Sequence, residues 1–174
     1  MCGIVAVLRR SSGRMPPDGA HLLGQLEQAV DAVGVLGGAD EAIADQDIPG
    51  PDLLARAAAQ VEGVDALLKG APGVRALLAD RALAVGVEHH AEQLQLATDR
   101  VEAALDANAG DLSTVELEDV NAALVRLKDA VWAVGHDRLR TAHAVADLCG
   151  SDLGPSAIEA FTSVQVALSA LDRL

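Results

Sequence analysis

Apolar and polar positions alternate with a helical period along most of this chain. From residue 18 onwards, leucine, valine and alanine recur at every third or fourth position, with polar residues between them. Such spacing places the apolar side chains on one face of an α-helix. The pattern predicts helices over 18–38, 51–70, 74–107, 113–150 and 155–174.

Local signals support the ends of these helices. Asp18 can cap the first helix, and Pro51 stands where a first helical residue belongs. Capping boxes, in which Ser is followed three residues later by Glu, begin the last two helices. They are formed by Ser113 with Glu116 and by Ser156 with Glu159.

Other segments predict interruptions. The acidic stretch 39–50 is expected to be a loop, and Ala71-Pro72-Gly73 is expected to be a turn. Gly86 is a candidate break in the long third helix, and Gly135 is a candidate bend in the fourth. The helices between these points predict an antiparallel bundle of about four amphipathic helices.

One stretch near the N-terminus departs from the helical period. Residues 3–8 read GIVAVL, a short apolar run that includes β-branched residues and predicts one buried β-strand. A single strand needs partners for its backbone hydrogen-bonding groups, and no equally good strand follows. The fold class predicted for the chain is therefore mainly α, with one short N-terminal strand that belongs to a larger sheet.

The composition changes this picture in one respect. Hydrophobic residues make up 51% of the 174 residues, yet Phe161 and Trp132 are the only aromatic ones. The core must therefore be built from alanine, leucine and valine, which favours close packing between helices.

Charge and cysteine content exclude several classes of function. The net charge of −13 argues against binding to nucleic acids or anionic membranes, which needs clustered basic residues. The N-terminus has no basic region followed by an apolar stretch of signal-peptide length, and no apolar run of about 18 residues predicts a membrane span. Cys2 and Cys149 do not form a disulfide framework or a zinc motif. A cytoplasmic protein without a cofactor or a metal is expected.

The histidines are interpreted as surface residues. His89 and His90 are neighbours and would point in different directions from a helix, so the pair at ligand spacing is Glu88 with Glu92. A solvated polar face is the favoured interpretation. His136 and His143 lie two turns apart on one face, which is too far for them to share an ion.

Cys2 has two interpretations. It is either a small buried side chain at the edge of the predicted strand, or a nucleophile at the terminus of the chain. Removal of Met1 is favoured when the second residue is small. The free α-amino group, with a pKa of about 8, then acts as general base towards the thiol of the same residue.

The opening residues, Met1-Cys2-Gly3-Ile4-Val5-Ala6-Val7, resemble the start of class II glutamine amidotransferases. The likeness is greatest to glutaminase domains that supply ammonia to a sugar-isomerase module. In that family, an N-terminal cysteine attacks the side-chain amide of glutamine. The resemblance implies that Cys2 is the catalytic nucleophile and that Gly3 to Val7 form the first strand of an αββα sandwich.

A second likeness lies at the other end of the chain. Residues 169–174, SALDRL, resemble the leucine-rich approach to an Arg-Gly pair that closes the family's first helix. The chain departs from the family pattern in two ways. Residues 10–155 lie between the two similar stretches. The family's carboxylate-binding arginine, its Asn-Gly oxyanion pair and its binding aspartate have no counterpart in this sequence. The sugar-isomerase module has no counterpart either, so the chain alone is not expected to be a competent glutaminase.

These likenesses predict three parts. Residues 1–14 would be the first strand of a glutaminase-like domain, 15–153 an inserted helical bundle, and 154–174 a helix that returns to that domain. By resemblance, the parent protein would use glutamine and a phosphosugar, in carbohydrate-derivative metabolism.

The alternative is a non-enzymatic helical bundle that mediates interaction or oligomerisation. The two hypotheses are compatible, because an inserted bundle is a natural surface for docking or for a homo-oligomer.

Overall fold

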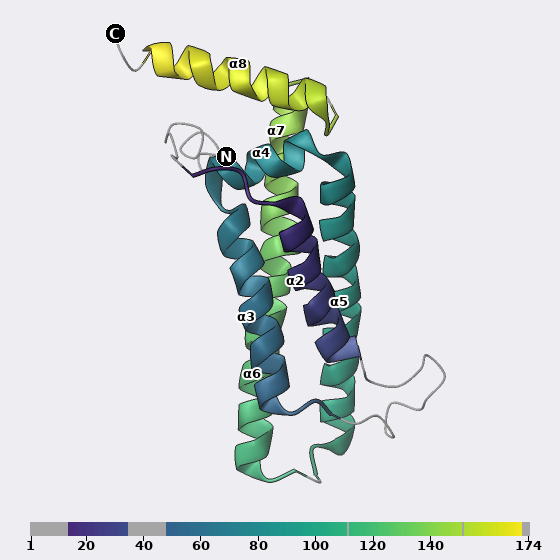
Figure 1. Cartoon of the computed structure of the whole chain (residues 1–174). Coiled ribbons are helices and arrows are strands. Elements are labelled where there is room, and N and C mark those ends of the chain that lie inside the picture. The colour runs from purple at the N-terminus through teal and green to yellow at the C-terminus, as the bar shows by residue number, and fades with distance from the viewer. Residues whose placement is uncertain (1–13, 35–47, 111, 151, 172–174) are drawn as a thin grey trace.

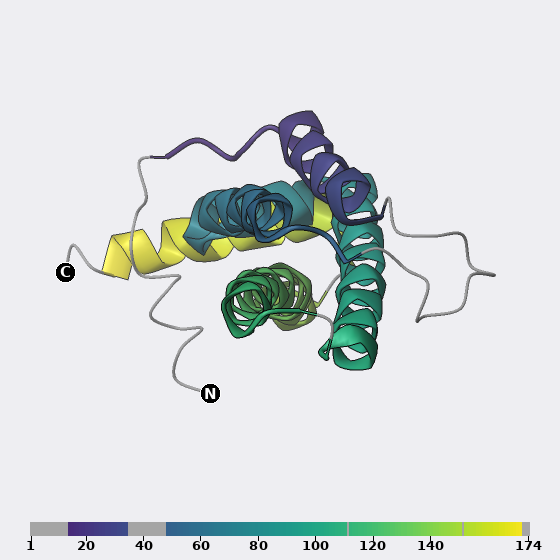
Figure 2. The same cartoon turned by 90° about the horizontal axis from the view of Figure 1, so that it is seen from below.

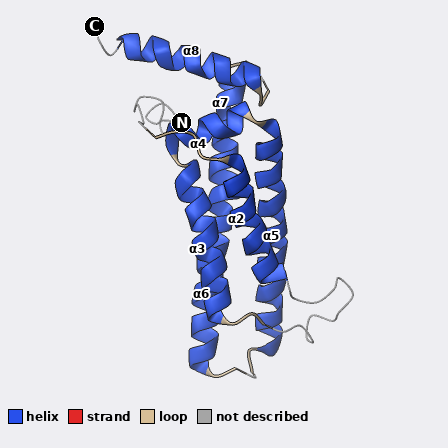
Figure 3. Cartoon of the chain, viewed as in Figure 1, coloured by secondary structure: helices blue, strands red, loops and turns tan. Residues whose placement is uncertain are grey.

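The computed structural model of the chain describes residues 14–34, 48–110, 112–150 and 152–171. These residues are mainly helical, which confirms the mainly α part of the predicted fold class, and they include no β-strand (Figures 1 and 3). The predicted strand at 3–8 lies outside the described residues. The helices are α2 (Gly19–Gly34), α3 (Pro51–Leu68), α4 (Gly70–Ala79), α5 (Arg81–Asn108), α6 (Thr114–Trp132), the π-helix η2 (Ala133–Arg138), α7 (Leu139–Leu148) and α8 (Pro155–Leu171).

Four long helical segments, α2, α3, α5 and the continuous segment α6–η2–α7, form a bundle. It is not the antiparallel bundle that the sequence predicted, because the neighbours α2 and α5 run in the same direction, and so do the neighbours α3 and α6 (Figure 1). Helix α3 packs against α2 and α6, and α5 packs against the same two neighbours, so α3 and α5 are diagonal to each other. Figure 2 shows this arrangement end-on. Helix α4 crosses one end of the bundle and carries the chain along the diagonal from α3 to α5 (Figure 1).

The bundle core is aliphatic, as the composition requires. The apolar positions predicted from the helical period form most of it, because each amphipathic helix turns that face towards its neighbours. Its fully buried side chains include Leu22, Leu26, Leu54, Val61, Leu94, Leu124 and Leu127.

Two predicted caps are confirmed by their hydrogen bonds. The Asp18 carboxylate accepts from the backbone N–H of His21 at 2.9 Å. Ser113 and Glu116 form the reciprocal capping box at the start of α6. Ser156, in contrast, lies inside the first turn of α8, so it is not the capping residue that the second box predicted.

The third predicted helix is divided, but not where the glycines suggested. Ala71-Pro72-Gly73 belong to the first turns of α4 rather than to a turn. The division comes at Asp80, whose backbone is extended and whose carboxylate caps α5 by accepting from the N–H groups of Ala82 and Leu83.

Gly86 lies inside an unbroken α5, where it has a packing role. A Cβ atom added at Gly86 would be 2.8 Å from a methyl group of Leu23. The absence of a side chain there lets α2 and α5 approach closely, so the glycine marks a helix contact and not a break.

At Gly135, the candidate bend, the structure has a π-helix. Residues 133–138 adopt the wider helix without interrupting the segment from α6 to α7. A π-helical turn accommodates extra residues within an α-helix and changes the direction of the side chains that follow.

A smaller core joins α8 to the end of the bundle. Phe161 is 1% exposed and lies in a cluster with Val74, Leu78 and Val145. The Arg75 guanidinium lies over the Phe161 ring, 5.9 Å from its centroid, and also donates to the side chain of Gln165. Helix α8 is thus held mainly by α4 and lies across the end of the bundle (Figure 1).

The two ends of the bundle segment lie at the same end of the molecule. Arg14 donates to the carbonyl of Lys69 at 2.6 Å, just before α4 begins. The N–H of Gly154 donates to the carbonyl of Leu78 at 2.8 Å, in the last turn of α4. A ten-residue helix is about 15 Å long, so both points are close to one short element.

Among the described helices, none combines the length and the apolar content that a membrane crossing needs.

Candidate functional site

Cys2, the nucleophile implied by the family resemblance, lies outside the described residues. The other cysteine, Cys149, follows α7 directly and is a half-buried free thiol. It lines none of the hollows described below. It packs against the smaller core, so it acts as a small packing residue.

The histidines of α5 do not form a joint site. His90 is partly buried and bonds through Nδ1 to the carbonyl of Gly86 at 2.7 Å, whereas His89 is exposed. Their rings meet edge to face. In the part of the chain that the structure describes, no group of three or more His, Cys, Asp or Glu side chains is arranged to hold a metal ion.

Glu88 and Glu92, however, face a hollow between α5 and the π-helix that sequence reasoning did not find. This α5–η2 pocket has a volume of about 510 Å³. Its wall on α5 is made by Glu88, Ala91, Glu92, Gln95 and Leu96. Its facing wall is made by Val131, Gly135, His136 and Leu139.

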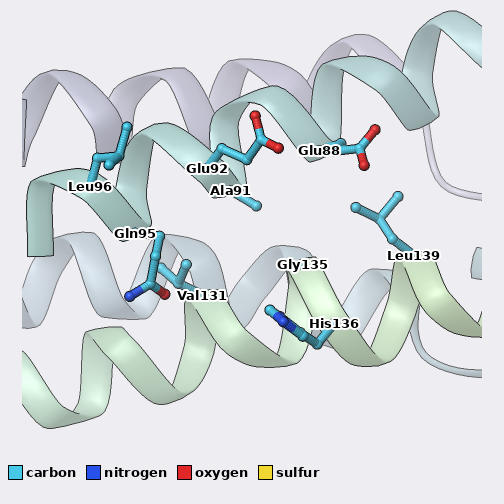
Figure 4. Close-up of a pocket in the computed structure, with 9 residues that line it drawn as sticks. All are labelled: Glu88, Ala91, Glu92, Gln95, Leu96, Val131, Gly135, His136 and Leu139. Atoms are coloured by element: carbon cyan, nitrogen blue, oxygen red, sulfur yellow. The ribbon is translucent and has the colours of Figure 1, made fainter. Parts of the chain in front are cut away.

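The pocket has an apolar floor and a polar rim. Ala91, Val131 and Leu139 are each at most 6% exposed and close its base. Figure 4 shows the Glu88 and Glu92 carboxylates on the α5 wall and the His136 ring on the opposite wall. This combination of an apolar base and a few polar groups is common in ligand sites of this size.

The π-helix explains why His136 is placed there. Gly135 lies against α5, where an added Cβ would be 3.3 Å from the Cβ of Ala91. The next residue, His136, stacks on Trp132 with ring centroids 3.6 Å apart and an angle of 8° between the planes. The stacking fixes one orientation of the imidazole at the pocket wall.

A second hollow continues the first towards α8. This α5–α7 pocket, of about 240 Å³, shares Glu88 and is lined by Arg81, Val85, His143 and Asp147, among others. His136 and His143, expected to share a helix face, therefore lie in adjacent hollows of one groove. We name the two pockets together the α5–α7 groove.

On the opposite side of the π-helix, two basic side chains bind a buried carboxylate. Asp65 of α3 is 8% exposed and receives hydrogen bonds from Arg138 Nε and Lys69 Nζ, each at 2.7 Å. Burial raises the pKa of Asp65, but the hydrogen bonds from Lys69 and Arg138 outweigh burial and keep that pKa below its usual range. Arg138 thereby ties the last residue of η2 to α3.

Other acidic residues between the helices are also compensated. Lys128 of α6 binds Glu102 and Asp99 of α5 at 2.7 and 3.4 Å. The hydrogen bond to Glu102 raises the pKa of Lys128. Arg126 forms two hydrogen bonds to Glu62 of α3.

The groove differs from these contacts. Within the described part of the chain, neither Glu88 nor Glu92 takes part in an ion pair. The groove therefore presents carboxylates that the described residues leave uncompensated, above an apolar base.

No protein-family model matches the chain, and neither the curated proteins nor the solved structures provide a match.

Proposed function

We propose that this chain is the N-terminal part of a protein similar to class II glutamine amidotransferases, with the helical bundle inserted into its glutaminase domain. Residues 1–14 would supply the first strand and the Cys2 nucleophile, and 154–174 would supply the helix that returns to the domain. The support from the sequence is the opening MCGIVAV and the leucine-rich end of the chain.

The structural observation that supports this proposal is the position of Arg14 and Gly154. An insertion into a domain is tolerated when its own ends lie close together. Both residues contact the short segment formed by Lys69 and α4, at one end of the bundle. The insertion hypothesis requires this arrangement, since ends at opposite poles of the bundle would separate the strand from its helix.

In the proposed reaction, the α-amino group of Cys2 accepts the proton of the thiol. The sulfur attacks the side-chain carbonyl carbon of glutamine, the C–N bond breaks and ammonia leaves with the proton. Water then hydrolyses the thioester to glutamate and regenerates the thiol. By resemblance, the parent protein would transfer the ammonia to a phosphosugar.

The bundle would take no part in this chemistry, because the groups that stabilise the oxyanion must lie within about 3 Å of the reacting oxygen. Its role in the proposal is to present a surface away from the glutaminase domain. This combines the enzyme hypothesis with the alternative of a helical interaction module. The observation that favours such a module is the continuous core within residues 22–142.

The test uses the protein expressed from the complete reading frame that contains this chain. Intact mass should show a mature protein that begins at Cys2, and the protein should release ammonia from glutamine. Cys2→Ala should abolish this release, and Cys149→Ala should leave it unchanged. Retention of Met1 in an active protein, or full activity of Cys2→Ala, would refute the mechanism.

A further inference from the structure

The α5–α7 groove carries an inference that does not depend on Cys2. We propose that it is a docking site for an amphipathic helix of a partner protein, with lysine or arginine in the middle of its apolar stripe. The proposal rests on the length of the groove, the placement of its apolar side chains and its uncompensated carboxylates.

The groove follows α5 for about three helical turns. Val85 and Leu96 lie near its two ends on α5, and they are 53% and 59% exposed. Eleven residues of α-helix span about 16 Å, or three turns. Two large apolar side chains exposed at this spacing match the anchor positions with which an amphipathic helix enters a groove.

The base of the groove allows close approach. Small residues form part of it on both sides, with Ala84 and Ala91 on α5, and Gly135 and Ala146 on the facing segment. Side chains of a partner helix would meet these small residues at the base and the larger Val85 and Leu96 at the ends. Such contacts bury apolar surface on both partners.

Charge decides the chemistry of the partner. Glu88 and Glu92 lie between the two apolar ends, one helical turn apart, and the described residues provide no ion pair for either. Across the same helix pair, Lys128 already compensates Asp99 and Glu102. A partner with basic residues at the centre of its stripe would supply the missing cations.

The same argument disfavours a second copy of this chain. The net charge of −13 makes two copies repel each other. Apart from the histidines, Arg81 is the one basic residue that lines the two pockets. Two grooves that face each other would therefore bring carboxylates together.

The chain contains its own reporter for binding. Trp132 is the one tryptophan of the chain, and there is no tyrosine. The Trp132 indole stacks on His136, which lines the groove. The probe is a designed alanine–glutamine peptide helix of about eighteen residues, five turns long. It has two leucines three turns apart and two lysines between them. A control peptide replaces both lysines with glutamate.

The lysine peptide should change the Trp132 emission of the full chain and bind at least about tenfold more tightly than the glutamate peptide. Glu88→Gln with Glu92→Gln should weaken lysine-peptide binding about tenfold. The matched variant is Glu27→Gln with Asp31→Asn, an exposed acidic pair one turn apart on α2. It removes the same charge and should change binding by less than about twofold.

The apolar anchors have a matched control as well. Leu96→Ser should weaken binding about tenfold because a leucine contact is lost, whereas Val125→Ser, at a similarly exposed site on α6 outside the groove, should have no effect. Isothermal calorimetry provides a second readout without Trp132.

Three outcomes would overturn the proposal. Equal losses in the two acidic double variants would show attraction by net charge alone. Failure of the lysine peptide to bind would exclude the docking site. Sedimentation that shows a dimer weakened by Leu96→Ser would assign the groove to a second copy.

Discussion

At the scale of single residues, Asp65 is the position where charge contributes most directly to the fold. It lies on the apolar stripe of α3, four residues after Val61, and joins α3 to the π-helix through Arg138. A buried carboxylate is tolerated there because two cations bind it. The same contact fixes one side of η2, while His136 lies at the groove on the other side.

Replacing Asp65 with asparagine should destabilise the fold by about 1–3 kcal/mol at neutral pH, since Arg138 and Lys69 lose their partner but remain in contact with water. Asp99→Asn is the control. It removes a half-exposed partner of Lys128, but Lys128 still binds Glu102. The free energy of unfolding should therefore fall by less than about 0.5 kcal/mol. Urea unfolding measures both, and equal costs would contradict the assigned role of Asp65.

The contribution of Asp65 should also depend on pH with a defined sign. Because the pKa of Asp65 is lower in the folded chain, the folded state binds fewer protons than the unfolded state. The stabilisation is complete above the ordinary value of 3.8 and is lost as pH falls through the lower pKa of the folded state. The difference between wild type and Asp65→Asn should therefore shrink in acid.

At the scale of elements, the junction between α3 and α4 depends on a glycine within a helix. The Cβ of an alanine at Gly73 would be 1.9 Å from the carbonyl oxygen of Leu68, which is backbone and cannot rotate away. The backbone changes direction sharply at Gly70, where α4 begins, and its φ of 75° is a conformation that glycine adopts readily.

Gly73→Ala should therefore destabilise the protein by more than about 2 kcal/mol, because the backbone at the junction must shift. Gly24→Ala on α2 is the matched change, since an added Cβ there meets no atom within 4 Å. It should stabilise the protein by about 0.5–1 kcal/mol through helix propensity. Thermal unfolding of both variants tests the pair, and a neutral Gly73→Ala would contradict the predicted clash.

Several local signals were interpreted correctly, although the Ser156–Glu159 box and the turn predicted at 71–73 were wrong. Asp18, Pro51 and the Ser113–Glu116 box act within one helical turn, so they could be read without knowledge of the fold. The division at Asp80 and the packing role of Gly86 could not be predicted from the sequence, because both depend on the packing of α2, α4 and α5. Gly135 was predicted as a candidate bend, and the π-helix found there packs against α3 and α5, which no local signal indicates.

The same limit applies to the candidate sites. Glu88 and Glu92 could be recognised from the sequence as a pair at helical spacing. Their position opposite His136 could not be predicted, because it depends on α5 and η2 being neighbours. Asp65 could have been found as an acid within an apolar stripe. Cys2 was identified from the opening of the chain, and its role stays a prediction.

At the scale of the whole molecule, the bundle and α8 belong to two different clusters of buried residues. The larger core lies within residues 22–142, and the smaller one joins Phe161 and Ala157 of α8 to α4 and α7. Because the larger core includes no residue of α8, we expect residues 14–153 alone to be helical and to unfold in one cooperative transition. Circular dichroism during urea unfolding measures this.

A comparison of two changes tests how α8 is attached. Phe161→Ala in the full chain removes the largest side chain of the smaller core, and a core phenylalanine is worth about 3–5 kcal/mol when its surroundings cannot relax. Here α8 can detach, so the loss cannot exceed the free energy that holds α8 on the bundle. We therefore expect Phe161→Ala to lower stability no more than removal of 154–174 does. A loss larger than that of the shortened chain, or a non-cooperative transition in residues 14–153, would show that α8 and the bundle form a single folding unit.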